Sequence, residues 1–295
     1  MIENWKKKIA DWKLQFILKR ASRLTERESR AVFWRLLPDL NEQENRTVVL
    51  KLLEGKEIQV LDNPVDHDRV ANFSAYDRDA WVEKKINAIP AGARVLDAGA
   101  GQGRYKNLLK HTQYEAQDFA QYEGSVAGPL QEVWEYSPLN YVCDITSIPV
   151  ESGSFDAVLC TEVLEHVPEP IKALAELSRL LKIGGSLILS VPLGSGVHQE
   201  PYYFYGGFSP YFFKHHFSQM GLEIEEIVPL GGLLKHAAQE LARVGRLIGE
   251  HQAANSHFEY LVKDWIPQQL QTLDSKYFIE QFTVGYLVKA KKVSA

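Results

Sequence analysis

VLDAGAGQG, residues 95–103, is the stretch of sequence that decides the fold. An apolar run typical of a buried strand leads into closely spaced glycines, which let backbone amides approach a ligand, and a helix is expected to follow. Gly103 comes two positions after Gly101, whereas a dinucleotide-binding GxGxxG turn needs three. Asp97 ends the strand, and a carboxylate there favours a ligand with an ammonium group over a pyrophosphate.

Apolar runs and helical stretches alternate on the carboxyl side of this turn. Further strands are expected at residues 114–117, 141–144, 155–160, 186–192, 222–230 and 282–290. Between two of them lies an amphipathic helix, IKALAELSRLL (171–181), which we expect Gly184 and Gly185 to cap. This alternation predicts βαβ units and therefore a largely parallel sheet.

Three acidic residues stand at the ends of three successive expected strands. Asp118 follows Asp97 by 21 residues, where an acid can accept hydrogen bonds from both ribose hydroxyls of a nucleoside. Asp144 with Ile145 can take an adenine amino group and cover the ring. Single aspartates at strand ends are otherwise turn or cap residues, and a glycine turn can serve packing alone. The three together favour a nucleoside with an ammonium and no phosphate, such as S-adenosylmethionine.

Three segments resemble class I S-adenosylmethionine-dependent methyltransferases, in particular the type 11-like methyltransferase domain family. They are VLDAGAGQG, SFDAVLCTEVLEHVPEPIKALAELSRLLKIGGSLILSVP (154–192) and FTVGYLVKAKK (282–292), within a resemblance that covers about residues 78–228 and 281–292. The resemblance implies an α/β fold with a Rossmann-like seven-stranded sheet in the order 3-2-1-4-5-7-6. The last strand would be antiparallel, helices would flank the sheet, and the cofactor would be S-adenosylmethionine.

The resemblance also implies a set of cofactor-binding residues, from the methionine-binding turn through the ribose and adenine positions to the segment beneath the methionine. They are Asp97, Gly99, Ala100, Gly101, Gln102, Asp118, Phe119, Asp144, Ile145, Cys160, Thr161 and Glu162. The second strand, Tyr114-Glu115-Ala116-Gln117, departs from the family in being polar.

Methyl transfer from a sulfonium depends on positioning and on exclusion of water, and an alcohol acceptor also needs a base. Two histidines are candidate catalytic residues. His198, in the loop after the fifth strand, is the predicted general base, whereas His166 in EVLEHVPEP is expected to have a positioning role. The loop aromatics Tyr202, Tyr203, Tyr205 and Phe208 form either an acceptor wall or a small satellite core.

The HxxPYxF pattern at residues 198–204 resembles relatives of glycan and natural-product pathways. We therefore predict O-methylation of a hydroxyl on a small-molecule or glycan-type acceptor. N- or C-methylation and a non-catalytic cofactor-binding accessory subunit are the alternatives. The glycine spacing disfavours a nicotinamide-dependent oxidoreductase. No metal is expected, because the chain has no cysteine cluster and the pocket loops lack HxxxH or paired-acid spacing.

The remaining segments are interpreted from their composition and charge. We expect an N-terminal helical extension (1–70) and a methyltransferase domain (71–295) with a helical insertion or cap (231–280). Residues 1–37 hold ten Lys/Arg against four Asp/Glu, while the net charge of −5 gives no sign of a nucleic-acid partner. We expect the basic helix to pack on the domain, to form a homodimer contact or a cofactor lid, or to make a peripheral membrane contact. Two cysteines without a disulfide framework and the absence of a membrane span favour the cytoplasm.

Overall fold

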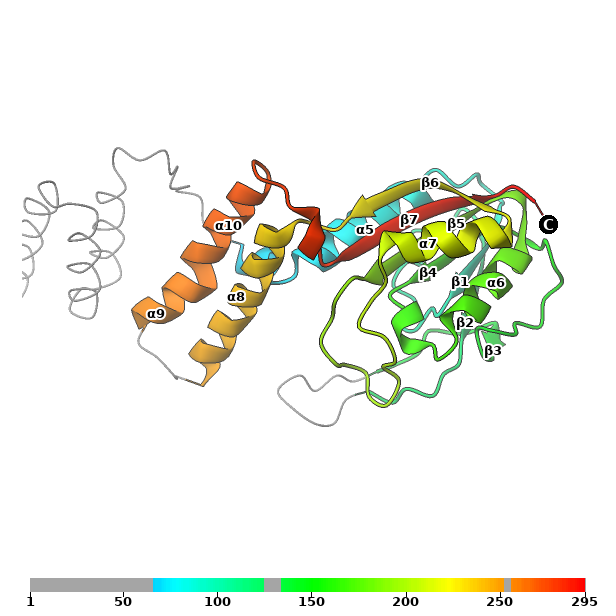
Figure 1. Cartoon of the computed structure of the whole chain (residues 1–295). Coiled ribbons are helices and arrows are strands. Elements are labelled where there is room, and N and C mark those ends of the chain that lie inside the picture. Colours follow the sequence, from blue (N-terminus) through cyan, green and yellow to red (C-terminus); the bar gives the residue numbers. More distant parts are fainter. Residues whose placement is uncertain (1–65, 125–133, 252–255, 295) are drawn as a thin grey trace, which may run out of the picture. The chain divides into compact units, whose positions relative to one another are not determined.

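The computed structural model describes residues 66–124, 134–251 and 256–294 (Figure 1). Residues 1–65 of the expected N-terminal extension lie outside this range, so its roles in packing, dimerisation or membrane contact stay predictions. Of the described residues, 72–236 and 276–294 form one compact unit, and 66–71 with 237–275 form another. The domain boundaries expected from the sequence also stay predictions.

The first unit contains a seven-stranded sheet in the order β3-β2-β1-β4-β5-β7-β6 (Figure 1). Its strands are β1 Arg94–Ala98, β2 Gln113–Asp118, β3 Tyr141–Val142, β4 Phe155–Thr161, β5 Leu181–Pro192, β6 Leu222–Pro229 and β7 Gly285–Lys292. β7 runs antiparallel to both of its neighbours, and the other pairs are parallel. The fold, the strand order and the antiparallel last strand expected from the sequence are confirmed.

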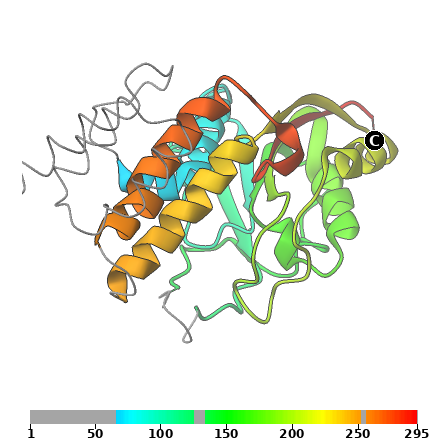
Figure 2. The ribbon, with the colours of Figure 1, turned by 60° about the vertical axis from the view of Figure 1, so that its left-hand side comes forward.

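Helices cover both faces of this sheet (Figure 2). They are α5 Phe73–Ile86, α6 Pro170–Leu180 and α7 Pro210–Phe217, with short 3-10 turns at Leu164–His166, Ser218–Met220 and Glu280–Phe282. Val158 and Cys160 of β4 belong to the core cluster that includes α6 and α7, whereas Leu159 packs with α5. Because successive strand residues point to opposite faces, β4 is apolar on both sides, as a central parallel strand requires.

The end of α6 corrects one prediction. Leu181, directly after the helix, is already extended (φ −74°, ψ 136°) and pairs with Phe155 of β4. The next pair along these strands joins Ala157 to Ser186, so residues 182–185 form a bulge in β5, with Gly184 at φ +88°. The expectation that Gly184 and Gly185 cap the helix was therefore wrong, because the chain enters the strand before it reaches them.

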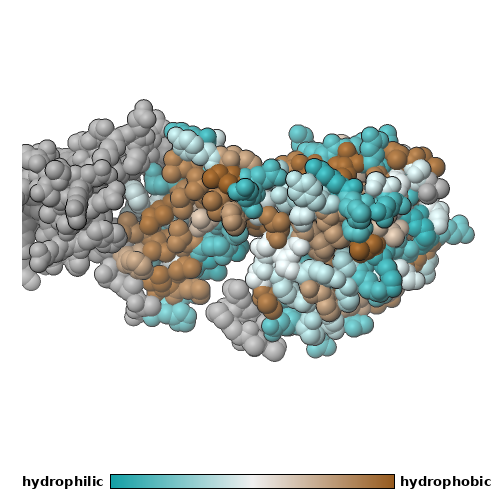
Figure 3. Space-filling model, in the orientation of Figure 1, coloured by the Kyte–Doolittle hydropathy of each residue, from teal (hydrophilic) through white to brown (hydrophobic). Residues whose placement is uncertain are grey.

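The second unit is helical. It contains α4 His67–Ala71, residues 237–250 of α8 Leu233–Glu250, α9 Ser256–Tyr260, a π-helical turn at Leu261–Trp265, and α10 Ile266–Asp274. Figures 1 and 2 both show α8 and α10 side by side. The buried residues of α8 are small or polar: Ala238, Gln239, Ala242 and Gly245. Val244 of the same helix is exposed, and Figure 3 shows apolar surface over this unit.

Within residues 66–124, 134–251 and 256–294, no helix has the combination of length and apolar character that crossing a bilayer needs.

Candidate active site

A cavity of about 750 Å³ lies in the first unit, at the carboxyl ends of β1, β2 and β4. This is where open α/β sheets bind ligands, and the volume is typical of a small-molecule site. Of the expected cofactor-binding residues, those lining the cavity are Asp97, Gly99, Ala100, Gly101, Gln102, Asp118, Phe119, Asp144, Ile145, Thr161 and Glu162. Cys160 does not line it; its side chain is fully buried in the hydrophobic core.

The turn after β1 has a geometry that only glycine tolerates. Gly99 (φ +72°) and Gly101 (φ +49°) both adopt left-handed backbone conformations. A Cβ at Gly99 would lie 2.4 Å from Val163 Cγ2, and one at Gly101 would lie 2.8 Å from Trp134 Cζ2. The amide of Gly101 donates to Asp118 Oδ2 at 2.9 Å, which ties the turn to the end of β2. The glycines therefore leave this wall of the cavity without side chains, so a ligand can approach the backbone closely.

Asp97 is a buried carboxyl group at this wall. Its side chain is 3 % exposed, and the hydroxyl of Tyr114 donates a hydrogen bond to Asp97 Oδ2 at 3.0 Å. Burial raises the pKa of Asp97 to about 6, the Tyr114 hydrogen bond lowers it, and the charge of Asp118 raises it. A ligand ammonium at this position would neutralise a charge that burial otherwise disfavours. The residues present thus fit the amino-acid end of S-adenosylmethionine.

The two further acids have different surroundings. Asp118, 7 % exposed, accepts hydrogen bonds from the amides of Gly101 and Ala120 (2.9 and 3.0 Å). Since a carboxylate has about four acceptor positions, Asp118 retains capacity for ligand hydroxyls. Asp144 is exposed and accepts from the amide and hydroxyl of Thr146, both at 2.8 Å, as in an ordinary Asx turn.

Trp134 is a cavity residue that sequence reasoning missed. Its ring lies edge-on to Tyr122, with ring centroids 5.2 Å apart, and borders the turn at Gly101. The indole Nε1–H is buried without a hydrogen-bond partner among the described residues. A buried donor of this kind is rare in a native fold, and a ligand acceptor would satisfy it.

Residues at the carboxyl end of β4 and directly after it line another part of the cavity. Glu162 has a positive φ of +53°, an uncommon conformation for a residue with a side chain. Its Oε1 accepts from the Ser190 hydroxyl at 2.7 Å, and its Oε2 lies 3.4 Å from Arg78 Nη1. Arg78 comes from α5 and also lines the cavity, so it is a second residue that the sequence reasoning did not identify.

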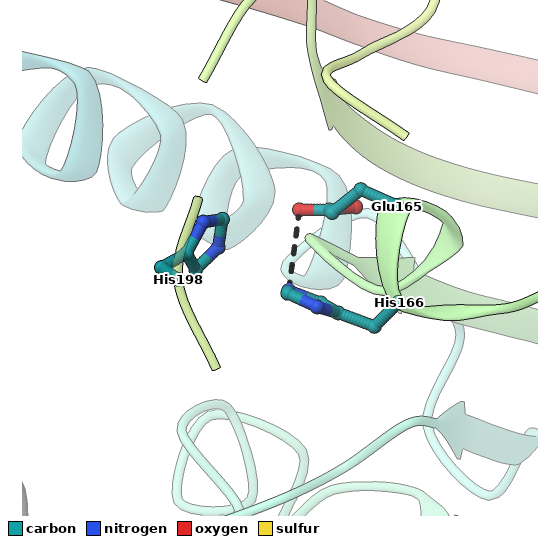
Figure 4. Close-up of side chains that lie close together, drawn as sticks. All are labelled: Glu165, His166 and His198. Carbon is teal, nitrogen blue, oxygen red and sulfur yellow. Dashed lines mark ion pairs between the residues drawn. The ribbon is translucent and has the colours of Figure 1, made fainter. Parts of the chain in front are cut away.

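Glu165, His166 and His198 form a cluster in the wall of the same cavity (Figure 4). One potential ligand atom of each residue lies within 4.8 Å of those of the other two. Glu165 and His166 come from the 3-10 turn after β4, and His198 faces them from the loop after β5. The two imidazoles meet edge to face, with ring centroids 4.8 Å apart. The structure thus brings the two predicted catalytic histidines together and adds Glu165.

Hydrogen bonds fix the proton positions of both histidines. His166 Nδ1 lies 2.6 Å from the carbonyl oxygen of Tyr202, and His198 Nδ1 lies 2.9 Å from that of Gly196. A carbonyl oxygen can only accept, so each neutral ring carries its proton on Nδ1 and a lone pair on Nε2. Burial lowers the pKa of His166 to about 4, whereas burial raises the pKa of Glu165 well above its usual range.

The aromatic residues of the loop divide between the cavity and the packing around it. Tyr202 lines the cavity and stacks edge-on against Phe119, with ring centroids 4.8 Å apart. Phe204, which was not among the predicted site residues, also lines it. The remaining three do not: Tyr203 donates to the Ser195 carbonyl (2.5 Å), Tyr205 donates to that of Pro168 (3.0 Å), and Phe208 is 5 % exposed in the core.

The central segment of the chain is similar to known methyltransferases. A family model described as a methyltransferase domain matches residues 96–189. A ubiquinone biosynthesis O-methyltransferase of Xanthomonas axonopodis pv. citri is 41 % identical over 105 residues, which cover 34 % of this chain and 44 % of that protein. A mouse tRNA (carboxymethyluridine(34)-5-O)-methyltransferase is 30 % identical over 144 residues, 47 % of this chain and 20 % of that protein. The matches thus span less than half of these relatives.

Solved structures resemble the chain more distantly. A Haemonchus contortus phosphoethanolamine N-methyltransferase 2, in complex with S-adenosyl-L-methionine, shares 18 % sequence identity with a TM-score of 0.45. The superposition covers 74 % of this chain and 53 % of that one.

Proposed function

We propose that this chain, which carries a class I S-adenosylmethionine-dependent methyltransferase domain, methylates a hydroxyl group of a small-molecule or glycan-type acceptor. The cofactor of this domain is S-adenosylmethionine, which supplies a methyl group on a sulfonium that is already a good leaving group. The protein's own contribution is therefore to hold the acceptor in line, to exclude water and to remove the hydroxyl proton.

The Glu165–His166–His198 cluster is the observation that carries this proposal. It shares one cavity with the acidic and glycine-rich residues of the cofactor wall, so a proton-accepting group lies beside the donor site. An alcohol holds its proton far above neutral pH and needs such a group, whereas a neutral amine does not. The cluster therefore favours oxygen as the acceptor atom.

In this proposal His198 accepts the proton and His166 positions it. His198 is exposed at the cavity, and Nε2 of its ring is left free to accept because Nδ1 bonds to Gly196. His166 has a pKa lowered to about 4 by burial and is held by the Tyr202 carbonyl, so its ring stays neutral and fixed. The edge-to-face contact between the rings then orients His198.

The acceptor class can be tested directly. The full chain is incubated with methyl-labelled S-adenosylmethionine and panels of phenols, sugar hydroxyls, amines and total tRNA. We expect label on a hydroxyl oxygen of a small molecule or glycan. Label on amines or carbon would show the alternative chemistry, label on tRNA would match the mouse relative, and cofactor binding without product from any panel would indicate an accessory subunit.

The role of His198 is tested with a matched pair of variants. His198→Ala should lower kcat by about 100-fold or more while leaving the KM for S-adenosylmethionine unchanged, because general bases contribute on that scale. His215→Ala is the control, since His215 is an exposed histidine of α7 and does not line the cavity. Full turnover in His198→Ala would refute the assigned proton acceptor.

A further inference from the structure

We propose that Glu165, His166 and His198 bind a divalent transition-metal ion, with Zn²⁺ as the test ion. These three side chains converge from two separate segments onto one cavity (Figure 4). Within residues 66–124, 134–251 and 256–294, these three residues form the group of possible metal ligands. Their ligand atoms all lie within 4.8 Å of one another. Spacing along the chain gave no sign of it, because His198 is 32 residues from His166.

The distances suit an ion after small side-chain rotations. A tetrahedral Zn²⁺ with bonds of about 2.0–2.1 Å holds its ligand atoms about 3.3 Å apart. His166 Nε2 and Glu165 Oε1 are 3.8 Å apart, about half an ångström beyond that separation. The third ligand atom, from His198, lies within 4.8 Å of the other two, which is up to about 1.5 Å beyond that separation, and its loop has open space around Gly194 and Gly196.

Both histidines already have the hydrogen bonds that metal-bound histidines show. A metal-ligating imidazole typically donates its other ring N–H to a carbonyl or carboxylate, which fixes the ring and its tautomer. Here Nδ1 of His166 donates to the Tyr202 carbonyl and Nδ1 of His198 donates to the Gly196 carbonyl. Each Nε2 is thus an unprotonated donor of electrons to an ion.

Glu165 provides an independent argument for a cation. Its side chain is 1 % exposed, and its Oε2 has no hydrogen-bond partner among the described residues. A carboxylate buried in this way is strongly unfavourable without a cation close by, and an ion bound at Oε1, the oxygen that faces His166, would stabilise its charge. The backbone carbonyl of Glu165 accepts from the amides of Phe204 and Tyr205 (2.9 and 3.2 Å), which ties the turn to the His198 loop.

The donor set selects the kind of ion. Two imidazole nitrogens and one carboxylate match the His₂Glu sites of zinc enzymes and leave a fourth position open. Mg²⁺ and Ca²⁺ prefer all-oxygen sites and are expected to bind poorly. An acceptor hydroxyl in the open position would ionise at lower pH, so the ion would replace His198 as the group that activates it. That role rests on the proposed function, whereas binding of the ion does not.

Binding is measured on the full chain after metal has been removed with a chelator. We expect one Zn²⁺ per chain with a micromolar or lower Kd, no comparable Mg²⁺ binding, and visible absorption bands when Co²⁺ replaces Zn²⁺. His198→Ala should weaken Zn²⁺ binding by about 100-fold or more and abolish the Co²⁺ bands, whereas His215→Ala should change neither. Because His198 is exposed, its variant is expected to fold, which unchanged binding of S-adenosylhomocysteine would verify.

Equal Zn²⁺ affinity in His198→Ala and His215→Ala would overturn the metal site. The activity assay separates this outcome from failure of the proposed function. Full methylation by the metal-free protein would overturn the ion's role and leave His198 as the base. Specific Zn²⁺ binding without methylation of any acceptor would support the site while contradicting the proposed function.

Discussion

The hydroxyl of Tyr114 donates a hydrogen bond to the carboxylate of Asp97, with 3.0 Å between the oxygen atoms, at the wall of the cavity. The two residues come from neighbouring parallel strands: Asp97 lies near the carboxyl end of β1, and Tyr114, near the amino end of β2 and paired with Val95, reaches it with its long side chain. Tyr114 therefore stabilises the charged form of an acid that burial pushes toward its neutral form. The balance between the two effects controls how well this wall receives an ammonium group.

Cofactor affinity is expected to depend on pH through Asp97. Burial raises its pKa to about 6, and only the ionised form attracts the ammonium of S-adenosylhomocysteine. The Kd should therefore be constant above pH 7 and rise up to tenfold per pH unit as the pH falls below 6. Calorimetric titrations from pH 5 to 8 measure this. Tyr114→Phe should shift the onset to higher pH, because it removes the hydrogen bond that lowers the Asp97 pKa.

Asp97→Asn should stabilise the free protein while it weakens binding of S-adenosylhomocysteine. A pKa raised from about 3.9 in the unfolded chain to about 6 adds stability at low pH, and that contribution is lost as the pH rises from about 4 to about 6. At pH 7 the ionised group thus destabilises the free protein by about 3 kcal/mol, so Asp97→Asn should raise its Tm. The same variant should weaken S-adenosylhomocysteine binding by about 30-fold or more and abolish its pH dependence. A lower Tm together with unchanged affinity would contradict both expectations.

Trp134→Phe tests whether the unpartnered indole N–H binds the ligand. In the described residues this donor makes no well-formed hydrogen bond and only a weak interaction with the Tyr136 hydroxyl, so its removal should leave the Tm of the free protein nearly unchanged. If the N–H donates to the bound nucleoside, the Kd for S-adenosylhomocysteine should rise about tenfold. A Kd equal to that of the unmodified protein would show that the ligand lies elsewhere in the cavity.

The fold and the convergence of the expected cofactor-binding residues on one cavity were predictable because their signals are local in the sequence. Asp97, the glycines and Asp118 end consecutive parallel strands, so chain order alone brings them to one edge of the sheet. The polar strand 114–117 also carried information, since Tyr114 contacts Asp97 and Gln117, 1 % exposed, accepts from the Gly99 amide at 3.2 Å. The sequence showed this strand to be unusual without showing which face its polar residues occupy.

The cluster around Glu165 was not predictable in the same way. His166 and His198 each stood out as titratable groups, but their contact depends on the path of an irregular loop. Glu165 was not singled out from the sequence, because its burial follows from packing that no periodicity encodes. Phe208 illustrates the converse case: Tyr202 and Phe204 of the same loop line the cavity, while the Phe208 side chain packs in the core beside Phe212 and Phe213.

Gly101→Ala should remove cofactor binding through contact with Trp134. An added Cβ would lie 2.8 Å from Trp134 Cζ2, and the backbone is already at φ +49°. Gly153→Ala is a matched control, because Gly153 has φ +67° and nothing within 4 Å of an added Cβ. Both variants should lose about 1 kcal/mol of folding free energy from the left-handed backbone. Only Gly101→Ala should also lose S-adenosylhomocysteine binding, as measured by calorimetry.

The helical unit contains a comparable pair of positions in α8. A Cβ at Gly245 would lie 2.4 Å from the Cα of Lys263, whereas one at Gly249 would meet the flexible carboxylate end of Glu259. Backbone cannot move aside as a side chain can, so Gly245→Ala should destabilise this unit by about 1–3 kcal/mol. Gly249→Ala should be neutral or stabilising, because alanine favours a helix more than glycine does. Hydrogen exchange of amides in residues 237–275, with those of the sheet as reference, measures both; equal protection in the two variants would mean that α8 and the segment around Lys263 are not closely packed.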